Sequence, residues 1–424
     1  LLNRSYFFER IESLTGQPSD SAALYTFMII DLDDFKAIND TYGHLAGDFA
    51  LQRISQVLRN NTHNDDVVSR LGGDEFAIFF PETVSKEQMI KVAQQIIKDC
   101  EELIEFQNNE FHCGCSIGIA FVKGEAFSLE LFRKQADLAM YHAKHNGKNT
   151  FRRFTSEMND KIKYRAEIER DLRKALIDFE QFELWYQPQF ELANNQLVGA
   201  EALIRWRHPE KGIILPSEFI QIAEETGLIV PIGEWVIETT CKQINEWQAY
   251  LSPHFHIAVN LSAKQIYQQN AVSVFKQMLS QYHVSPERLH AEVTESLLMQ
   301  DENEADKTVT AIRDLGVQVW LDDFGTGYSS LAYLRRFHFD GVKIDRSFIS
   351  DIEENTYDRA LTSAVIDMAK NLGISAIAEG VETDFQVNFL KRRECSIAQG
   401  FFYSQAIPAG DFEAMFFKQK QQVV

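Results

Sequence analysis

Short apolar runs that end in acidic side chains recur along the chain. Residues 317–321 are mostly apolar and lead directly into Asp322, Asp323 and a glycine-punctuated turn, and residues 25–30 lead in the same way into Asp31. A buried strand that ends in carboxylates is a common place to hold a divalent cation. Because neighbouring residues of a strand point to opposite sides, a cation bound by both Asp322 and Asp323 must sit at the strand's end. Taken alone, such a segment could equally be an ordinary strand with an acidic turn.

The first 154 residues alternate between helical and strand patterns and predict an α/β unit. The Gly72-Gly73 pair suits a tight hairpin, which would place Asp74 and Glu75 at its tip, facing Asp31. Three acids from two neighbouring turns suit a two-cation site for in-line attack on a phosphate, although spacing alone leaves a plain acidic turn as the alternative. The expected elements are strands at 25–34, 66–71, 75–80, 112–122 and 150–154, and helices around 51–58, 85–106 and 128–145.

The rest of the chain predicts a charged helix and then a second α/β domain, from about 165 to 424. Residues 155–181 are dense in charge and predict a solvated helix, a plain connector or alternatively a joint that transmits state between domains. The first two strands that follow are separated only by a polar turn around Asn194-Asn195, so they should be antiparallel, whereas the others should be parallel. This pattern predicts an eight-stranded α/β barrel with one reversed strand, at 183–189, 197–206, 256–261, 289–294, 317–322, 341–344, 375–379 and 397–403.

Nearly every one of these strands carries a polar side chain at or near its end. In a barrel, such side chains converge on the C-terminal face. Oxygen ligands of this kind suit Mg²⁺ or Mn²⁺, and no His/Cys cluster indicates zinc; His208 is expected on the surface. Any single member could equally be a satisfied core residue, but the whole set indicates a site. Its members are Gln187, Glu201, Arg205, Asn260, Glu292, Asp322, Asp323, Lys343, Glu379 and Gln399.

Composition limits the class of protein. With 424 residues, 45% of them hydrophobic, the chain can bury two large cores. A net charge of −20 argues against binding nucleic acid but permits small phosphorylated ligands held through metal ions. Five scattered cysteines indicate a reduced, cytoplasmic protein. No apolar run is long enough to form a membrane-spanning helix, so we expect no membrane contact from this sequence. Residue 1 is leucine, so we expect a fragment whose missing N-terminal region could carry a sensor or a membrane anchor.

The hairpin sequence Arg70-Leu-Gly-Gly-Asp-Glu-Phe76 and the blocks at 31–40 and 43–48 are similar to those of the diguanylate cyclase (GGDEF) family. The resemblance covers residues 2 to about 154 and implies a palm-like α/β fold that joins two GTP into cyclic di-GMP with two metal ions. It implies metal binding by Asp31, the Leu32 carbonyl and Asp74, activation of the 3′-hydroxyl by Glu75, guanine recognition by Asn39 and Asp48, and triphosphate binding by Lys144 and Lys148. For the two lysines, a solvated helix end is the alternative.

Three departures from that family matter. The inhibitory product site of the family uses Arg-x-x-Asp, but this chain has His63 at the arginine position and retains only Asp66, so we expect weak or no product inhibition there. Lys148 stands where the family often has arginine, which removes some bidentate grip. The chain begins inside the family's usual opening motif, so we expect the element that pairs two cyclase domains to be absent and the cyclase to be weak.

Seven blocks of the second half resemble the EAL phosphodiesterase family, which hydrolyses cyclic di-GMP to the linear dinucleotide pGpG. The resemblance covers essentially the whole domain and implies a TIM-like barrel that takes part in bacterial second-messenger signalling. Every catalytic position of the family is filled, and the one late departure, at 404–406, lies past the ligands. The matching blocks are 201–206, 259–262, 292–295, 322–330, 342–345, 379–382 and 399–401.

The EAL resemblance assigns a role to each member of the predicted ring. Glu201, Asn260, Glu292 and Asp322 would hold one Mg²⁺ or Mn²⁺, and Asp322, Asp323 and Glu379 would serve a second. Lys343 would orient the attacking water, Glu379 could act as base, and Gln187, Arg205 and Gln399 would hold substrate. Glu295 and Glu382 would pin a switch and homodimer loop that includes Phe324, Gly325 and Thr326.

These features favour a working hydrolase fused to a cyclase domain with an intact motif. One alternative keeps the hydrolase but makes the first domain a GTP-binding regulator. The other is a non-catalytic cyclic di-GMP receptor, which the filled ligand positions disfavour.

Overall fold

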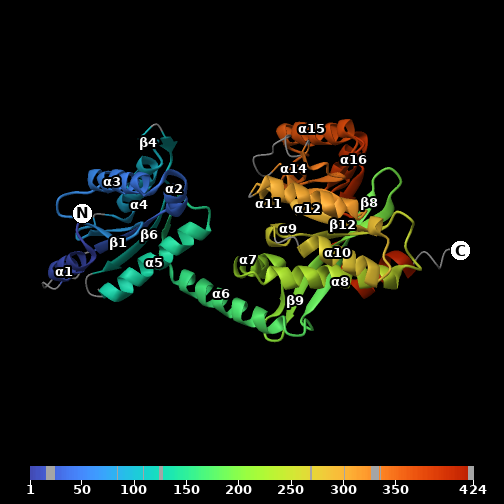
Figure 1. Ribbon diagram of the computed structural model, residues 1–424, viewed down its shortest axis with the longest axis horizontal. Helices are drawn as coiled ribbons and strands as arrows, with labels where there is room; N and C mark the ends of the chain where they lie inside the picture. The colour runs from blue at the N-terminus through green and yellow to red at the C-terminus, as the bar shows by residue number, and fades with distance from the viewer. Residues whose placement is uncertain are drawn as a thin grey trace. The chain divides into compact units, whose positions relative to one another are not determined.

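The computed structural model describes residues 1–15, 24–83, 85–107, 109–123, 128–267, 270–299, 301–325, 334 and 336–418. The chain divides into two compact units, Leu1–Arg165 and Ala166–Val424 (Figure 1). Within the described part of the chain, no helix is both long and apolar enough to cross a membrane.

The first unit is built on a five-stranded sheet in the order β2-β3-β1-β6-β7. Both faces of β1 are buried, because Met28 and Ile30 pack into one hydrophobic cluster while Phe27 and Ile29 pack into another. Helices α2, α3 and α4 contribute to the first cluster, and α1 and α5 contribute to the second. The elements are α1 (Arg4–Thr15), β1 (Leu24–Leu32), α2 (Phe35–Tyr42), α3 (His44–Asn60), β2 (Val67–Gly72), β3 (Glu75–Phe80), α4 (Lys86–Cys100), β4 (Ile104–Phe106), β5 (Asn109–Phe111), β6 (Cys115–Lys123), α5 (Leu129–His145) and β7 (Phe151–Arg153).

One helix is shorter than its pattern predicts. The helix expected to reach residue 106 ends at Cys100, and β4 and β5 pair as a separate antiparallel hairpin. Ile104 is buried while Glu105 is exposed, which is the alternation of a half-buried strand rather than of a helix.

The second unit contains a closed eight-stranded barrel, as the sequence predicts. Strand β8 is antiparallel to both β9 and β16, and the other neighbouring pairs of the barrel are parallel, so β8 is the reversed strand. The barrel strands are β8 (Phe182–Glu191), β9 (Gln196–His208), β11 (His256–Asn260), β12 (Leu289–Thr294), β13 (Gln318–Phe324), β14 (Gly341–Ile344), β15 (Ser375–Ala378) and β16 (Ile397–Gln399).

Helices follow most of these strands. They are α7 (Pro216–Thr226), α8 (Ile229–Trp247), α9 (Ala263–Tyr267), α10 (Asn270–Gln281), α11 (Glu295–Leu298), α12 (Glu302–Asp314), α14 (Arg346–Ser350), α15 (Thr356–Leu372), α16 (Asp384–Arg392) and α17 (Ala409–Phe412). Two short strands, β10 (Gly212–Ile214) and β17 (Ile407–Pro408), extend the sheet beside β9 and β8.

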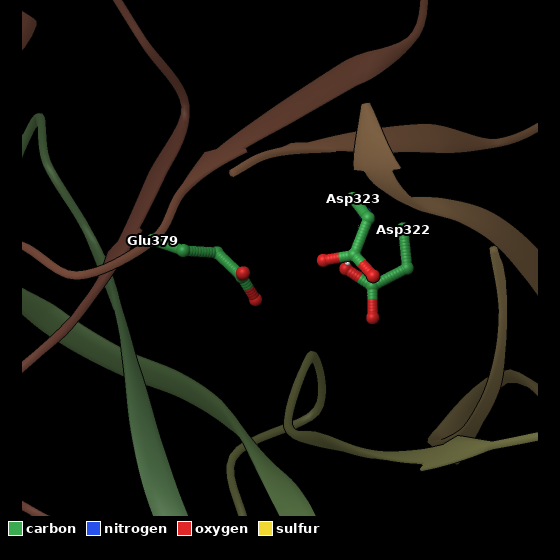
Figure 2. A group of neighbouring side chains, drawn as sticks. All are labelled: Asp322, Asp323 and Glu379. Carbon is green, nitrogen blue, oxygen red and sulfur yellow. Dashed lines mark hydrogen bonds between the residues drawn. The ribbon is translucent and has the colours of Figure 1, made fainter. Parts of the chain in front are cut away.

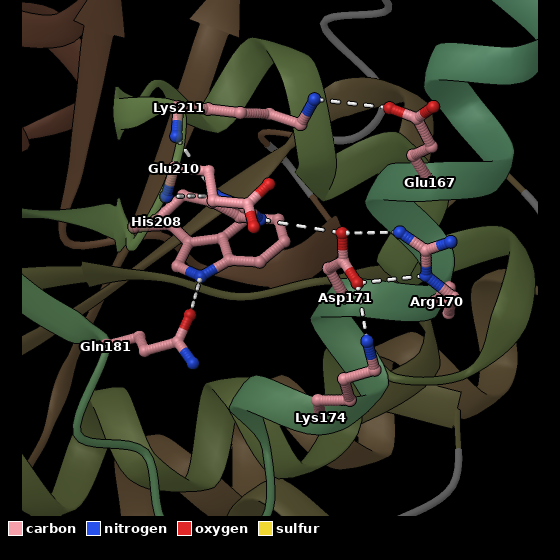
Figure 3. Close-up of polar contacts among 9 residues, drawn as sticks. Glu167, Arg170, Asp171, Lys174, Gln181, His208, Glu210 and Lys211 are labelled. Atoms are coloured by element: carbon pink, nitrogen blue, oxygen red, sulfur yellow. Dashed lines mark hydrogen bonds and ion pairs between the residues drawn. The ribbon is translucent and has the colours of Figure 1, made fainter.

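The charged helix is α6 (Ser156–Ala175), and its last turns belong to the second unit. Asp171 receives hydrogen bonds from Arg170 and Lys174 and lies 3.6 Å, Oδ2 to Nε2, from His208 (Figure 3). His208 is buried, so its expected place on the surface is wrong. Its Nδ1 atom accepts the backbone N–H groups of the turn that follows β9, which explains why this polar ring tolerates burial.

Candidate metal centre

The polar ring predicted from the strands comes together inside the barrel. In the strand registers, Gln187 lies opposite Glu201, and Asn260 lies opposite Glu292. Since side chains alternate along each strand, one register position on every strand points to the interior. The closed barrel therefore brings together residues that are separated by as many as 212 positions in the chain.

Lys343 lies at the centre of this group. Its Nζ atom lies 2.8 Å from Glu292 Oε2 and 2.8 Å from Glu379 Oε1. It also lies 3.2 Å from Asp322 Oδ1 and 3.4 Å from Glu201 Oε2. Only 1% of the lysine is exposed. One ammonium group thus contacts four carboxylates that come from four different strands or strand ends.

Two amide side chains complete the surroundings of Glu201. Asn260 Nδ2 donates to Glu201 Oε1 at 2.7 Å, and Gln399 Nε2 donates to Glu201 Oε2 at 2.6 Å. The same Gln399 nitrogen donates to Gln187 Oε1 at 3.1 Å. Each carboxylate oxygen of Glu201 is therefore held by its own amide.

Asp322, Asp323 and Glu379 form the acidic edge of the site (Figure 2). One carboxylate oxygen from each lies within 4.8 Å of the others. Asp323 has a left-handed backbone, with φ of 53°, where the β13–β14 register shifts. This turn breaks the strand alternation that would separate the two aspartates, so both carboxylates lie on the same side of the chain.

Burial and the positive charge of Lys343 have opposite effects on the pKa values of the carboxyl groups. Burial raises the pKa of Glu292 well above its usual value and raises that of Glu379 to about 8, despite Lys343. Burial also raises the pKa of Asp323. For Glu201 burial acts in the same direction, but Lys343 and the two amides outweigh it and lower the pKa. Burial would lower the pKa of Lys343, and the surrounding acids reverse that effect.

The charge balance fits divalent cations. Lys343 supplies one positive charge among Glu201, Glu292, Asp322, Asp323 and Glu379, which leaves an excess of carboxylates in a buried place. Uncompensated buried charge is costly, so such a group either takes up protons, as the raised pKa values of Glu292 and Glu379 indicate, or binds further cations. Carboxylate and amide oxygens without sulfur or imidazole suit Mg²⁺ or Mn²⁺.

Strand β9 carries Arg205 and also contributes residues to the wall of a cavity. The Arg205 guanidinium lies 5.3 Å from the centre of the Trp185 ring, and its buried Nε has no hydrogen-bond partner among the described residues. Gln187 Nε2 donates to the Ser404 carbonyl at 3.3 Å. A cavity of about 580 Å³ is lined by residues of β9, α7 and α8 and by Asn260.

The residues expected to control the switch loop lie at, or a few residues after, the ends of barrel strands. Glu295 is buried at the start of α11, and Glu382 Oε1 accepts from Arg346 Nη2 at 2.8 Å. Phe324 ends β13 and Gly325 follows it. Thr326 lies outside the described residues, so the structure does not report on its expected role.

The first unit has its own acidic group. The register of β1 and β3 places Asp31 opposite Glu75, and Leu32 N donates to the Asp74 carbonyl at 3.3 Å. Burial raises the pKa of Asp31 to about 6, against the effect of Lys144, whose Nζ lies 2.5 Å from Asp31 Oδ1.

The other residues expected to bind nucleotide lie on the neighbouring helices and loop. Asn39 on α2 is half-buried and packs against Gly47, whereas Asp48 on α3 is exposed. Lys148 pairs with Asp34 rather than with the acidic group, at 2.7 Å. Asp66 accepts the backbone N–H of His63 at 2.7 Å.

Two buried polar residues near the site were not expected from the sequence. Gln189 Nε2 donates to Gln399 Oε1 at 2.9 Å, and His256 Nε2 lies 3.0 Å from Gln189 Oε1. Gln189 stands two positions from Gln187 on β8, so strand alternation was the one sequence signal that could have placed it inside the barrel.

Comparison with known proteins divides the chain in the same order. The family model described as "EAL domain" matches residues 169–406. The model described as "Diguanylate cyclase, GGDEF domain" matches residues 1–150.

Two curated relatives match nearly the whole chain. It is 37% identical over 409 residues, 96% of this chain, to the bifunctional diguanylate cyclase/cyclic di-GMP phosphodiesterase MucR of Pseudomonas aeruginosa. It is 37% identical over 384 residues, 91% of this chain, to the cyclic di-GMP phosphodiesterase PdeR of Escherichia coli. The chain spans only 59% and 58% of the lengths of these relatives.

Solved structures agree. The PaMucR phosphodiesterase in its c-di-GMP complex is 40% identical, with a TM-score of 0.56 over 58% of this chain and 99% of that chain. The S helix-GGDEF-EAL part of Vibrio cholerae LapD has a TM-score of 0.62 over 95% of this chain and 94% of that chain; at 22% identity it supports the fold alone.

Proposed function

The chain belongs to the EAL domain family and carries a GGDEF domain before its EAL domain, and we propose that its barrel hydrolyses cyclic di-GMP to pGpG in a divalent-metal-dependent reaction. Relatives that are 36–37% identical over at least 91% of the chain are named as cyclic di-GMP phosphodiesterases. One observation carries the proposal: four carboxylates converge on the buried Lys343 ammonium, with Asp323 beside them.

In the proposed reaction, two Mg²⁺ or Mn²⁺ ions would be held by Glu201, Asn260, Glu292, Asp322, Asp323 and Glu379. When bound, such a pair of ions lowers the pKa of an attacking water and stabilises charge on the phosphoryl oxygens. Lys343 orients the water and offsets charge that develops on phosphorus oxygens. Glu379 accepts one proton of that water, whose oxygen attacks phosphorus in line. The P–O3′ bond breaks, the 3′-oxygen takes up a proton from solvent to become a hydroxyl, and the phosphate stays on the 5′-oxygen of pGpG.

Substrate binding is assigned to residues beside the acids. Arg205 presents a buried donor, Nε, without a partner among the described residues, and a dinucleotide phosphate would satisfy it. Gln187 presents a half-buried amide beside the acids, and Gln399, whose own amide bonds Glu201, Gln187 and Gln189, would act on substrate by holding Gln187. The cavity beside Asn260 is large enough for one purine base.

The test is hydrolysis of cyclic di-GMP by the purified chain with Mg²⁺ or Mn²⁺, followed by separation of pGpG. Glu201→Ala should abolish hydrolysis, and Glu353→Gln, a change at an exposed acid of the same unit, should leave it unchanged. Binding without turnover by the wild-type chain would favour a receptor. Retained hydrolysis in Glu201→Ala would contradict the ligand assignment.

For the GGDEF domain we propose GTP binding through Asp31, the Leu32 carbonyl and Asp74, with Glu75 beside them. The register that sets Asp31 opposite Glu75 favours this candidate. Asn39 and Asp48 would read guanine, and Lys144 and Lys148 would hold phosphates. Two outcomes then remain, synthesis of cyclic di-GMP from two GTP or regulation of the barrel by bound GTP.

Two incubations separate these outcomes. In the first, the chain receives Mg²⁺ and GTP alone, and cyclic di-GMP or pGpG would support a cyclase. In the second, it receives cyclic di-GMP with and without GTP, and faster hydrolysis without consumption of GTP would support regulation. If GTP alone yields no product and added GTP leaves hydrolysis unchanged, a role for GTP is contradicted.

A further inference from the structure

We propose that His256 is a positioning residue for Glu201 and acts through two buried amides, Gln189 and Gln399. His256 Nε2 lies 3.0 Å from Gln189 Oε1, Gln189 Nε2 lies 2.9 Å from Gln399 Oε1, and Gln399 Nε2 lies 2.6 Å from Glu201 Oε2. The chain of contacts crosses the barrel interior from β11 through β8 and β16 to β9. The inference rests on the proposed function of Glu201 as a metal ligand.

The direction of every hydrogen bond in this chain follows from the carboxylate. Ionised Glu201 can only accept, so Gln399 must present its nitrogen to Glu201 and its oxygen to Gln189. Gln189 must then donate from its nitrogen and present its oxygen to His256. The ring can satisfy that oxygen only with a proton on Nε2. Flipping either amide, or moving the ring proton to Nδ1, would place two acceptor atoms opposite each other at the neighbouring contact.

Because the three side chains are buried, these hydrogen-bond directions cannot be reversed at low cost. Exposure is 0% for Gln189, 4% for Gln399 and 6% for His256, so water is not a ready substitute partner for any of them. An unpaired polar atom in such a place costs free energy, so the amides cannot rotate independently. Burial also lowers the pKa of His256 to about 4, which keeps the ring neutral with a single N–H group.

The backbone makes room for the histidine to reach across a strand. His256 on β11 lies opposite Gly199 on β9, and Gly199 lies opposite Gln189 on β8. A Cβ atom added at Gly199 would lie 2.6 Å from His256 Nε2 and 2.8 Å from Cδ2 and Cε1. The missing side chain at Gly199 is therefore what lets the ring extend over β9 to the amide of β8.

A second histidine holds the ring from its other face. His290 stacks on His256, with ring centroids 3.8 Å apart and planes 13° apart, and Trp320 stacks on His290. His290 is equally buried but has no hydrogen bond to Gln189 among the described contacts. It provides a matched control, because it shares the packing of His256 and not its place in the chain of hydrogen bonds.

This arrangement fixes the carboxylate before any ion arrives. Gln399 holds Glu201 Oε2 while Asn260 holds Oε1, so the remaining lone pairs of both oxygens have a set direction. Groups that orient a ligand from outside commonly change metal affinity by about ten- to a hundred-fold when removed. We expect His256 to act on metal affinity by this route.

The experiment measures Mn²⁺ binding to the metal-free full chain by electron paramagnetic resonance of free Mn²⁺, together with kcat, KM and thermal unfolding. His256→Gln places an amide donor near the position of Nε2, whereas the shorter His256→Asn cannot reach Gln189. We expect His256→Asn to weaken Mn²⁺ binding about tenfold. His256→Gln should restore most of this loss, and His290→Asn should stay within about twofold of wild type.

A double-mutant cycle with Gln189→Leu, again measured as Mn²⁺ affinity, is the second test. Once Gln189 is gone, adding His256→Asn should weaken Mn²⁺ binding no further, whereas a general packing effect would add in full. The inference is overturned if His256→Asn binds Mn²⁺ like wild type, if His290→Asn shows the same loss, or if the losses add. If His256→Asn does not fold, Gln189→Leu alone tests the link, and wild-type affinity in that variant overturns it.

Failure of the proposed function would look different. In that case the wild-type chain would not bind Mn²⁺, or Glu201→Ala would bind it as tightly as wild type. Failure of the positioning role leaves both of those results as proposed and changes only the His256 and Gln189 variants.

Discussion

The backbone N–H of Asp323 donates to the carboxylate of its neighbour Asp322, with N and Oδ1 2.8 Å apart. Asp323 adopts a left-handed φ of 53°, so two consecutive residues of a strand present their carboxylates together (Figure 2). Position 323 therefore combines a carboxylate of the proposed metal site with an unusual backbone conformation. The contributions of the charge and of the conformation can be separated by substitution.

Asp323→Asn should lower hydrolysis of cyclic di-GMP by about 10²-fold or more with little change in Tm, because asparagine tolerates the left-handed conformation but loses the charge. Asp323→Ala should lose the same activity and also about 1–2 kcal/mol of stability, because alanine does not favour this conformation. Turnover and thermal unfolding measure the two effects. Equal Tm values for both variants would argue against the backbone requirement, and wild-type turnover in Asp323→Asn would remove Asp323 from the metal site.

Lys343→Met should make stability depend on added metal. The lysine is buried against four carboxylates, and removing one partner of a buried ion pair typically costs about 3–5 kcal/mol. We expect the metal-free variant to have a lower urea midpoint of unfolding than metal-free wild type. Saturating Mn²⁺ should reduce the difference between the two midpoints. Hydrolysis should stay at least about 10²-fold below wild type even with Mn²⁺. Full activity in the variant would exclude Lys343 from the reaction.

Metal removal should destabilise the second unit. If the ions bind only the folded barrel, Mn²⁺ at about a hundred times its Kd should add about 2.7 kcal/mol for each independent site. We expect Tm to rise with added Mn²⁺ or Mg²⁺ and to return to its starting value with excess chelator. Asp322→Asn is the matched variant, and its Tm should respond less. A Tm that ignores Mn²⁺ in the wild-type chain would speak against the site.

Acid should destabilise the barrel through His256. Its pKa is near 6.5 when unfolded and about 4 in the folded barrel, because burial opposes its charge. Between these values the unfolded chain binds a proton that the folded chain does not. The stability that His256 contributes is therefore fully present above pH 6.5 and falls by about 3 kcal/mol as pH decreases toward 4.

Urea unfolding at pH 7 and pH 5 measures this effect. The carboxylates are common to wild type and to His256→Gln, so the difference between the two reports on His256 together with its effect on the stacked His290. We expect a smaller loss of stability at pH 5 in His256→Gln. An equal loss in both proteins would mean that His256 does not carry the acid sensitivity.

The strand pattern predicted the barrel because closure depends on features that a sequence displays. The short turn at Asn194-Asn195 required β8 and β9 to be antiparallel, and the longer segments that follow allowed parallel pairing. Alternation then placed polar residues such as Glu201 and Glu292 on the interior face. These are local properties of single strands.

Features that depend on contact between distant strands were not predictable in the same way. The left-handed Asp323 has no sequence signal of its own, since aspartate is compatible with many conformations. His208 looked like a surface residue because its partners are backbone groups of a turn and Asp171 of helix α6. The contact between His256 and Gln189 depends on the register of three strands and on the absence of a side chain at Gly199.

The position of β8 between β9 and β16 determines what happens when the chain is truncated at its N-terminal side. This strand joins β9 to β16, and both pair with it in the antiparallel direction. A piece of the chain that began after residue 191 would leave these two strands with unpaired backbone N–H and C=O groups. Exposed edges of this kind recruit other chains, so such a piece should self-associate into sheets even though every acidic ligand of the proposed metal site is still present.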